Sequence, residues 1–76
     1  MAKRVTTITV IADLIFIEAQ RESACGTIEG VSVEPYAAKY ANWRVFAVHP
    51  ASLDAECQQA VAAIAKKLSG KVDCQL

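Results

Sequence analysis

The C-terminal part of the chain carries the pattern that most restricts the fold: Ser52 to Gly70 reads as one amphipathic helix. Its apolar side chains recur at i, i+4, i+7, i+8, i+11 and i+15, a spacing that gathers them on one helix face. They are Leu53, Cys57, Ala60, Val61, Ile64 and Leu68. Ser52 is the expected N-cap, and Gly70 is the expected left-handed exit. This feature constrains the architecture and says almost nothing about chemistry.

Length and apolar content together predict a small single domain that leaves apolar surface exposed unless its core is packed unusually well. A chain of 76 residues buries only about 60% of its unfolded surface on folding, yet 54% of these residues are hydrophobic. Either the core is packed unusually well or a partner covers some apolar surface. We therefore expect one domain, 1–76, with a homodimer contact or a docking surface.

The charge balance argues against a nucleic-acid partner. The chain has 8 basic and 8 acidic side chains, for a formal net charge of zero. A nucleic-acid-binding protein of this size normally carries a basic excess that neutralises phosphates. We expect a mixed, solvated surface and a protein partner.

The N-terminal region has part of the pattern of a signal peptide, because Lys3 and Arg4 precede an apolar run from Val5 to Ile17. Threonines dilute this run and Asp13 interrupts it. The apolar stretch after Asp13 is far too short to cross a bilayer. We expect a cytoplasmic protein with no membrane partner.

The cysteine pattern predicts free thiols. Cys25, Cys57 and Cys74 are an odd number without a C-x-x-C pair, whereas a secreted disulfide scaffold usually has an even set. We expect three reduced thiols that act as small apolar residues. Cys57 and Cys74 both fall on inward-facing positions near enough to bridge, but the expected compartment argues against that bond.

Four segments are expected to be strands. They are Val5–Ala12, Ile28–Glu34, Trp43–His49 and Lys71–Leu76. The first and third are apolar on both faces, which is typical of interior strands, and the other two are more polar, as edge strands are. In the third strand, Trp43, Val45 and Ala47 are expected on one face, with Phe46 and Val48 on the other.

These elements predict an α+β fold, with about four strands in a mainly antiparallel sheet packed by the C-terminal helix. Interior first and third strands fit the order of a ferredoxin-like βαββαβ arrangement, in which Asp13–Cys25 is the first helix. The competing model makes Leu14–Gln20 a strand, because Ile and Phe prefer strands, and yields a β-meander plus one helix. We slightly favour the ferredoxin-like order.

The connection between the second and third strands holds the candidate partner-binding residues. They are Tyr36, Lys39, Tyr40, Trp43 and Arg44. Aromatic rings beside an arginine are typical of protein-binding hot spots. In the competing interpretation, the rings of Tyr36, Tyr40 and Trp43 cover the open end of a thin core.

Candidate catalytic and metal-binding residues are few. His49 lies at a strand-to-helix junction and Cys57 lies in the next helix, so a thiol enzyme using this pair is one alternative. Cys57 falls on the buried helix face, where a thiol is unreactive, and Cys25 is the cysteine expected to react first. The three cysteines and His49 share no metal-ligand spacing, so we expect no metal and no cofactor.

By exclusion, these features predict a small non-catalytic protein-interaction module. Such a module acts as an accessory regulator or inhibitor by covering the surface of another protein. A small-ligand or metal-sensing module of ferredoxin-like type is the alternative, because that topology hosts many unrelated activities. The thiol enzyme is the second alternative.

Overall fold

The computed structural model describes residues 3–39 and 41–75. Its elements follow the order β-α-β-β-α-β, with a short 3-10 helix after the first α-helix. They are β1 Arg4–Thr6, α1 Ile8–Gln20, η1 Ser23–Cys25, β2 Gly30–Pro35, β3 Trp43–His49, α2 Ala55–Ser69 and β4 Val72–Cys74. The α+β class is confirmed. Among the described residues, however, the strands form two separate pairs, so the expected four-stranded antiparallel sheet of ferredoxin-like order is not formed.

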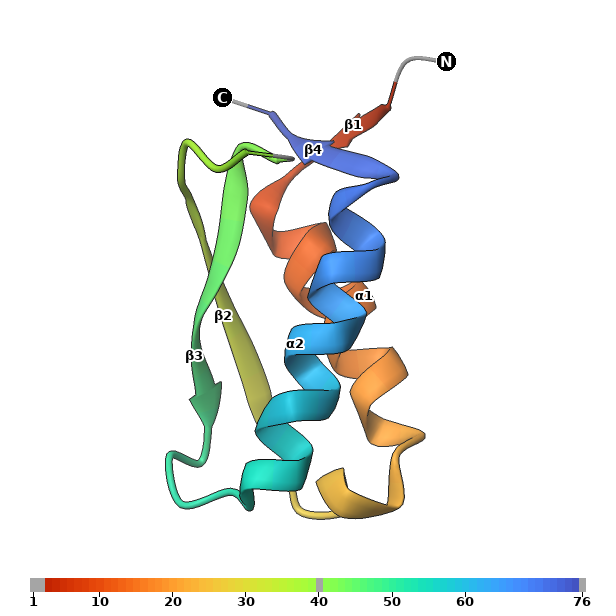
Figure 1. The fold of residues 1–76 in the computed structure, drawn as a ribbon, viewed down its shortest axis with the longest axis vertical. Coiled ribbons are helices and arrows are strands. Elements are labelled where there is room, and N and C mark those ends of the chain that lie inside the picture. Colours follow the sequence, from red (N-terminus) through yellow and green to blue (C-terminus); the bar gives the residue numbers. More distant parts are fainter. Residues whose placement is uncertain (1–2, 40, 76) are drawn as a thin grey trace.

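The elements are arranged in two layers (Figure 1). The antiparallel hairpin of β2 and β3 forms one layer and the two helices form the other, with β2 against α1 and β3 against α2. The β1–β4 pair lies across one end of the helices. None of the helices in the described part of the chain is long and apolar enough to span a membrane.

Side chains from the hairpin occupy the edge of β4 that faces away from β1. The amide group of Asn42 donates to the Cys74 carbonyl oxygen at 2.9 Å and accepts from the Cys74 N–H at 2.8 Å. The indole N–H of Trp43 donates to the Val72 carbonyl oxygen at 2.9 Å. These bonds satisfy backbone groups that a third strand would otherwise use. The parallel β1–β4 pair therefore stays separate from the hairpin.

The N-terminal region departs most from the sequence prediction. The strand predicted over Val5–Ala12 ends at Thr6, and the helix predicted from Asp13 already starts at Ile8. Thr7 is the N-cap of α1, because its Oγ1 accepts a hydrogen bond from the Val10 N–H at 3.2 Å. The N-cap oxygen satisfies a donor that has no partner within the helix.

Tertiary burial explains why this β-branched segment is helical. Ile11, Ile15 and Ala19 share one face of α1 and are all 0% exposed. Burying an aliphatic side chain of the size of Ile contributes about 1.5–3 kcal/mol. The helix-propensity cost of such a residue is below about 1 kcal/mol, so burial decides. The competing strand over Leu14–Gln20 is therefore wrong.

α2 follows the predicted apolar stripe, but both of its ends differ from the prediction. Cys57 and Val61 lie on the stripe and are buried. Asp54, not Ser52, occupies the N-cap position, and it makes no side-chain capping bond. Gly70 has a φ of −77°, so the expected left-handed exit is also wrong.

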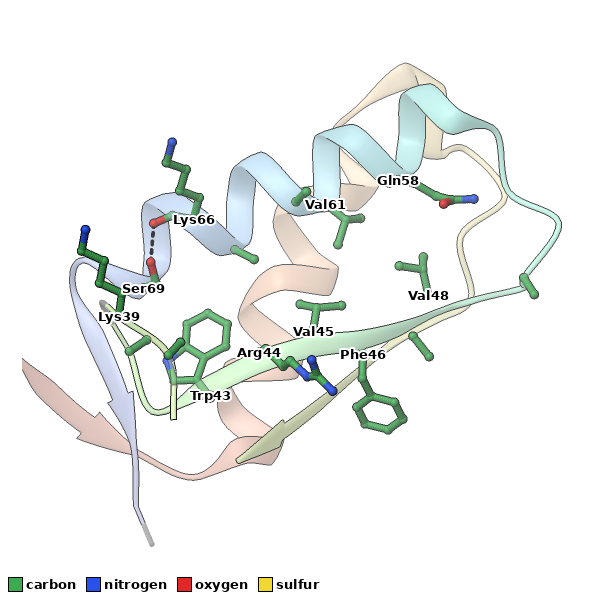
Figure 2. Close-up of a pocket in the computed structure, with 16 residues that line it drawn as sticks. Lys39, Trp43, Arg44, Val45, Phe46, Val48, Gln58, Val61, Lys66 and Ser69 are labelled. Atoms are coloured by element: carbon green, nitrogen blue, oxygen red, sulfur yellow. Dashed lines mark hydrogen bonds between the residues drawn. The ribbon is translucent and has the colours of Figure 1, made fainter. Parts of the chain in front are cut away.

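A β-bulge in β3 changes which side chains face the helices. Phe46 is the extra residue at the bulge, because the pairing with β2 shifts there. Val45 and Val48 both point toward α2, whereas Phe46 points away (Figure 2). The expected grouping of Ala47 with Val45, and of Val48 with Phe46, is therefore wrong.

The cysteines are not all reduced. Cys25 and Cys57 form a disulfide with their Cα atoms 4.9 Å apart, and it joins η1 to α2. Both residues are at most 1% exposed. Cys74 is the free cysteine in the described part of the chain, and it is buried. The expectation of three reduced thiols, with Cys25 the most reactive, is therefore wrong.

Candidate binding groove

An open groove of about 710 Å³ runs between β3 and α2 (Figure 2). All residues of β3 from 43 to 48 line it. Successive side chains of a strand point to opposite faces. A groove bordered by all of them therefore runs along the edge of the strand, against its main chain.

The opposite wall is one side of α2. Its lining residues recur at helical spacing along almost the whole helix: Gln58, Val61, Ala62, Ala65, Lys66 and Ser69. Val61 is buried and points across the groove toward β3, while the two alanines leave room beside it. The groove is therefore apolar along most of its length.

Positive charge lies at one end of this groove. Lys39, Lys66 and Ser69 line the end formed by the last turn of α2, and Arg44 lines the β3 wall. The lining residues described by the structure include no Asp or Glu. The groove therefore combines an apolar channel with a cationic end.

The outer face of the hairpin presents aromatic groups and an ordered arginine. The Nε–H of Arg44 donates to Glu34 Oε1 at 2.7 Å, and its guanidinium carbon lies 4.1 Å from the centre of the Tyr36 ring. Tyr36 is 46% exposed and Phe46 is 56% exposed. An exposed cation–π contact contributes only about 0.5–1 kcal/mol, so this cluster orders the surface more than it stabilises the fold.

The structure separates the five predicted partner-binding residues. Lys39 and Arg44 line the groove, whereas Tyr36 does not line it and lies beneath the guanidinium of Arg44. Trp43 borders the groove but is only 3% exposed and belongs to the core. For Trp43, the competing interpretation of a ring that covers a thin core is the one observed. Tyr40 lies outside the described residues.

Sequence reasoning missed the groove and most of the residues that border it, among them Phe46, Ala62, Ala65 and Lys66. A signal was present in α2, where small residues at i and i+3 flank the apolar stripe. Small side chains beside a buried stripe leave space that larger ones would fill. Strand alternation already predicts Phe46 on the face opposite Val45, whereas the bulge, which turns Val48 toward α2, has no local signature in this sequence.

His49 and Cys57 do not form a catalytic pair. The Cys57 sulfur is bonded to Cys25 and buried, whereas His49 is exposed, with its Nε2 2.8 Å from Ser32 Oγ. Catalytic serine–histidine pairs rely on a third group that orients the base, and no described carboxylate bonds to this histidine. We interpret the contact between Ser32 and His49 as a diagonal cross-strand pair.

In residues 3–39 and 41–75, no group of three His, Cys, Asp or Glu side chains is placed to hold a metal.

A second apolar surface lies on α1. Val10, Leu14 and Ile17 are 42%, 40% and 50% exposed and follow the i, i+4, i+7 spacing of one stripe. This α1 stripe flanks the buried face of the helix that holds Ile11 and Ile15. The solvent-facing side of a surface helix is normally polar. The stripe is therefore a candidate interface.

Comparison of the chain with protein-family models, with curated proteins and with solved structures finds no match. The surfaces of the molecule are therefore the evidence for its function. Two of them are candidate interfaces: the groove between β3 and α2, and the α1 stripe.

Proposed function

We propose that this chain is a small non-catalytic protein-interaction module, an accessory regulator or inhibitor that acts by covering the surface of a partner protein. The observation that carries the proposal is the open apolar groove between β3 and α2. Exposed contiguous apolar surface marks interaction sites in small proteins. Removing such surface from water contributes about 25 cal/mol per Å², against which stand the entropic costs of association.

The groups around the groove suit a protein partner. Tyr36, Phe46 and Arg44 are of the residue types enriched at protein interfaces. Arg44 is already held by Glu34 and by the Tyr36 ring, so little side-chain entropy is lost when it is covered. This ordered edge beside an apolar channel supports a binding role.

Two neighbouring alanines of α2 provide a matched test. Ala62 and Ala63 are both exposed, but only Ala62 lines the groove. Tagged wild-type protein and Ala63→Glu should capture the same partner from the native cell. Ala62→Glu should capture about tenfold less, because it places a charge in an apolar contact, while the melting temperature stays unchanged. Equal capture by both variants would contradict a partner seated in the groove.

We also propose a homodimer formed through the α1 stripe. A two-fold interface pairs a surface patch with itself, so the patch must be self-complementary. Leu14 and Ile17 supply its apolar part, and groups of both signs, Glu18 with Lys67 and Lys71, line the same depression beside them. Opposite charges on one rim suit such self-pairing.

Sedimentation analysis tests the dimer. Ile17→Glu should be monomeric at a concentration where the wild-type chain is dimeric, because the charge enters an apolar contact. Gln20→Glu adds the same charge to an exposed position of α1 outside the α1 stripe and should leave the dimer intact. A monomeric wild-type chain at high concentration would rule the dimer out.

A cytoplasmic location is a separate proposal, made from the N-terminal pattern. The Cys25–Cys57 disulfide weighs against it, because such bonds persist mainly in oxidising compartments. Rapid alkylation of the protein in its native cell tests the location. Alkylated Cys25 and Cys57 would indicate the cytoplasm, and an intact bond would indicate an oxidising compartment.

A further inference from the structure

One edge of β3 has no strand partner within residues 3–39 and 41–75. β2 pairs with the other edge, and that pair is the whole of its sheet. An open strand edge presents a row of N–H and C=O groups that can pair with another extended chain. The groove between β3 and α2 runs along this edge, because all residues from 43 to 48 line it.

The hairpin hydrogen bonds indicate which groups face that open edge. The Tyr36 N–H donates to the Asn42 carbonyl oxygen at 2.9 Å, so the backbone of Asn42 faces β2. Backbone groups in an antiparallel strand alternate between its two edges. The N–H and C=O groups of Trp43 and Val45 therefore face away from β2, and those of Arg44 face toward it.

The dimensions of the groove match one added strand. The groove follows six residues of β3, 43 to 48, which at about 3.3 Å per residue span about 20 Å. α2 stands along the same edge and closes the other side, so a single extended segment of about six residues fills the space. A slot between a strand edge and a helix is the geometry of β-strand addition.

The charge of the groove defines the chemistry of its occupant. Cationic groups line one end, at Lys39 and Lys66, and the described lining includes no acidic side chain. Val45 and Val61 face the middle of the channel. From these observations we infer that the groove binds an extended apolar segment of a partner protein that carries acidic residues at one end. The segment pairs with the open edge of β3. This inference rests on the proposed function and specifies the partner of the same site.

A synthetic peptide tests the inference directly. The probe is a six-residue segment of alternating Val and Thr followed by two Asp, and its control ends in two Lys. The Asp peptide should bind and slow amide hydrogen exchange at Val45, which faces the open edge. Exchange at Arg44, which faces β2, should not change. Binding of the peptide without slower exchange at Val45 would overturn strand addition.

Two substitutions in α2 test the charge requirement. Lys66 lines the groove, whereas Ala63 is exposed and does not line it. Lys66→Gln and Ala63→Glu each lower the net charge by one. Lys66→Gln should weaken binding of the Asp peptide by about fivefold, whereas Ala63→Glu should leave it unchanged. Equal effects of the two substitutions would overturn the assignment of an acidic end, because both change the net charge by the same amount.

Two further outcomes separate this inference from the proposed function. If neither peptide binds but Ala62→Glu still abolishes partner capture, strand addition is wrong and the interaction module stands. If the isolated chain already protects the Val45 amide as a dimer, a second copy occupies the groove and the acidic segment is wrong. If capture does not depend on Ala62, the proposed site fails together with the inference.

Discussion

The indole N–H of Trp43 donates a hydrogen bond to the carbonyl oxygen of Val72 at 2.9 Å, and this bond joins the hairpin to the β1–β4 pair. The two residues are 29 positions apart in the sequence, and both are buried. A ring expected to lie at a binding surface therefore connects the two sheets and fills the core between them.

Truncation of Trp43 should destabilise the fold strongly. We expect Trp43→Ala to lower the free energy of unfolding by about 3–5 kcal/mol, because it leaves a cavity and an unpaired Val72 carbonyl. Trp43→Phe keeps most of the buried surface and should cost less. Urea denaturation measures both changes. A Trp43→Ala variant as stable as the wild-type chain would place the ring outside the core.

The side chain of Asn42 should stabilise β4 as a neighbouring strand would, because it bonds to the N–H and C=O groups of Cys74. Asn42→Ala removes both bonds to the Cys74 backbone, and we expect a loss of about 2–3 kcal/mol. Amide hydrogen exchange at Cys74 should accelerate. Exchange at Gln75, whose N–H is bonded to the Thr6 carbonyl oxygen, should change much less. Uniform acceleration at both positions would indicate global unfolding instead.

The start of α1 can be tested with two threonines. Thr7→Ala removes the N-cap oxygen and should cost about 1 kcal/mol. Thr9 is exposed within the helix, so Thr9→Ala should change stability by less than about 0.5 kcal/mol. Thermal unfolding followed by circular dichroism compares the two variants. Equal effects would indicate that the helix starts nearer Asp13, as its sequence pattern predicts.

The Cys25–Cys57 bond should contribute strongly to stability. It links residues separated by 32 positions, and closing a loop of this size in the unfolded chain stabilises the fold by about 3–4 kcal/mol. A reducing agent should therefore lower the melting temperature of the wild-type chain and have no further effect on Cys57→Ala. The same sensitivity to reductant in both proteins would show that the bond does not form.

Local signals identified α2 and β3 well. The stripe from Leu53 to Leu68 has a 3.6-residue period over several turns. The short apolar run Trp43–His49 likewise predicts β3 with its observed bounds. Both patterns are properties of neighbouring residues. They depend little on what the element packs against.

Local signals could not distinguish helix from strand in the N-terminal half. Ile11 and Ile15 lie among apolar residues on every side of the helix, so the segment fits a strand as well as a helix by composition. Its helical state depends on burial against β2 and α2, which no local window contains. The outcome is therefore an example of tertiary packing overriding β propensity.

Only part of the candidate site could be predicted from the sequence. Tyr36 and Arg44 were identified because aromatic and arginine residues cluster in one connection. The groove was not, because it requires β3 to lie beside α2 with Val48 turned toward α2 by a bulge. Lys66 and Ala62 acquire a role only once that juxtaposition exists.

The amino-acid sequence by itself determined the α+β class, the C-terminal helix and the third strand, because periodicity and composition act over a few neighbouring residues. Only the tertiary structure decided the pairing of strands, the Cys25–Cys57 bond and the burial of Trp43. Each of these joins groups that are distant in the chain. The side chain of Asn42 occupies the edge of β4 that a third strand would need. This contact between distant residues forms only when the whole core is assembled.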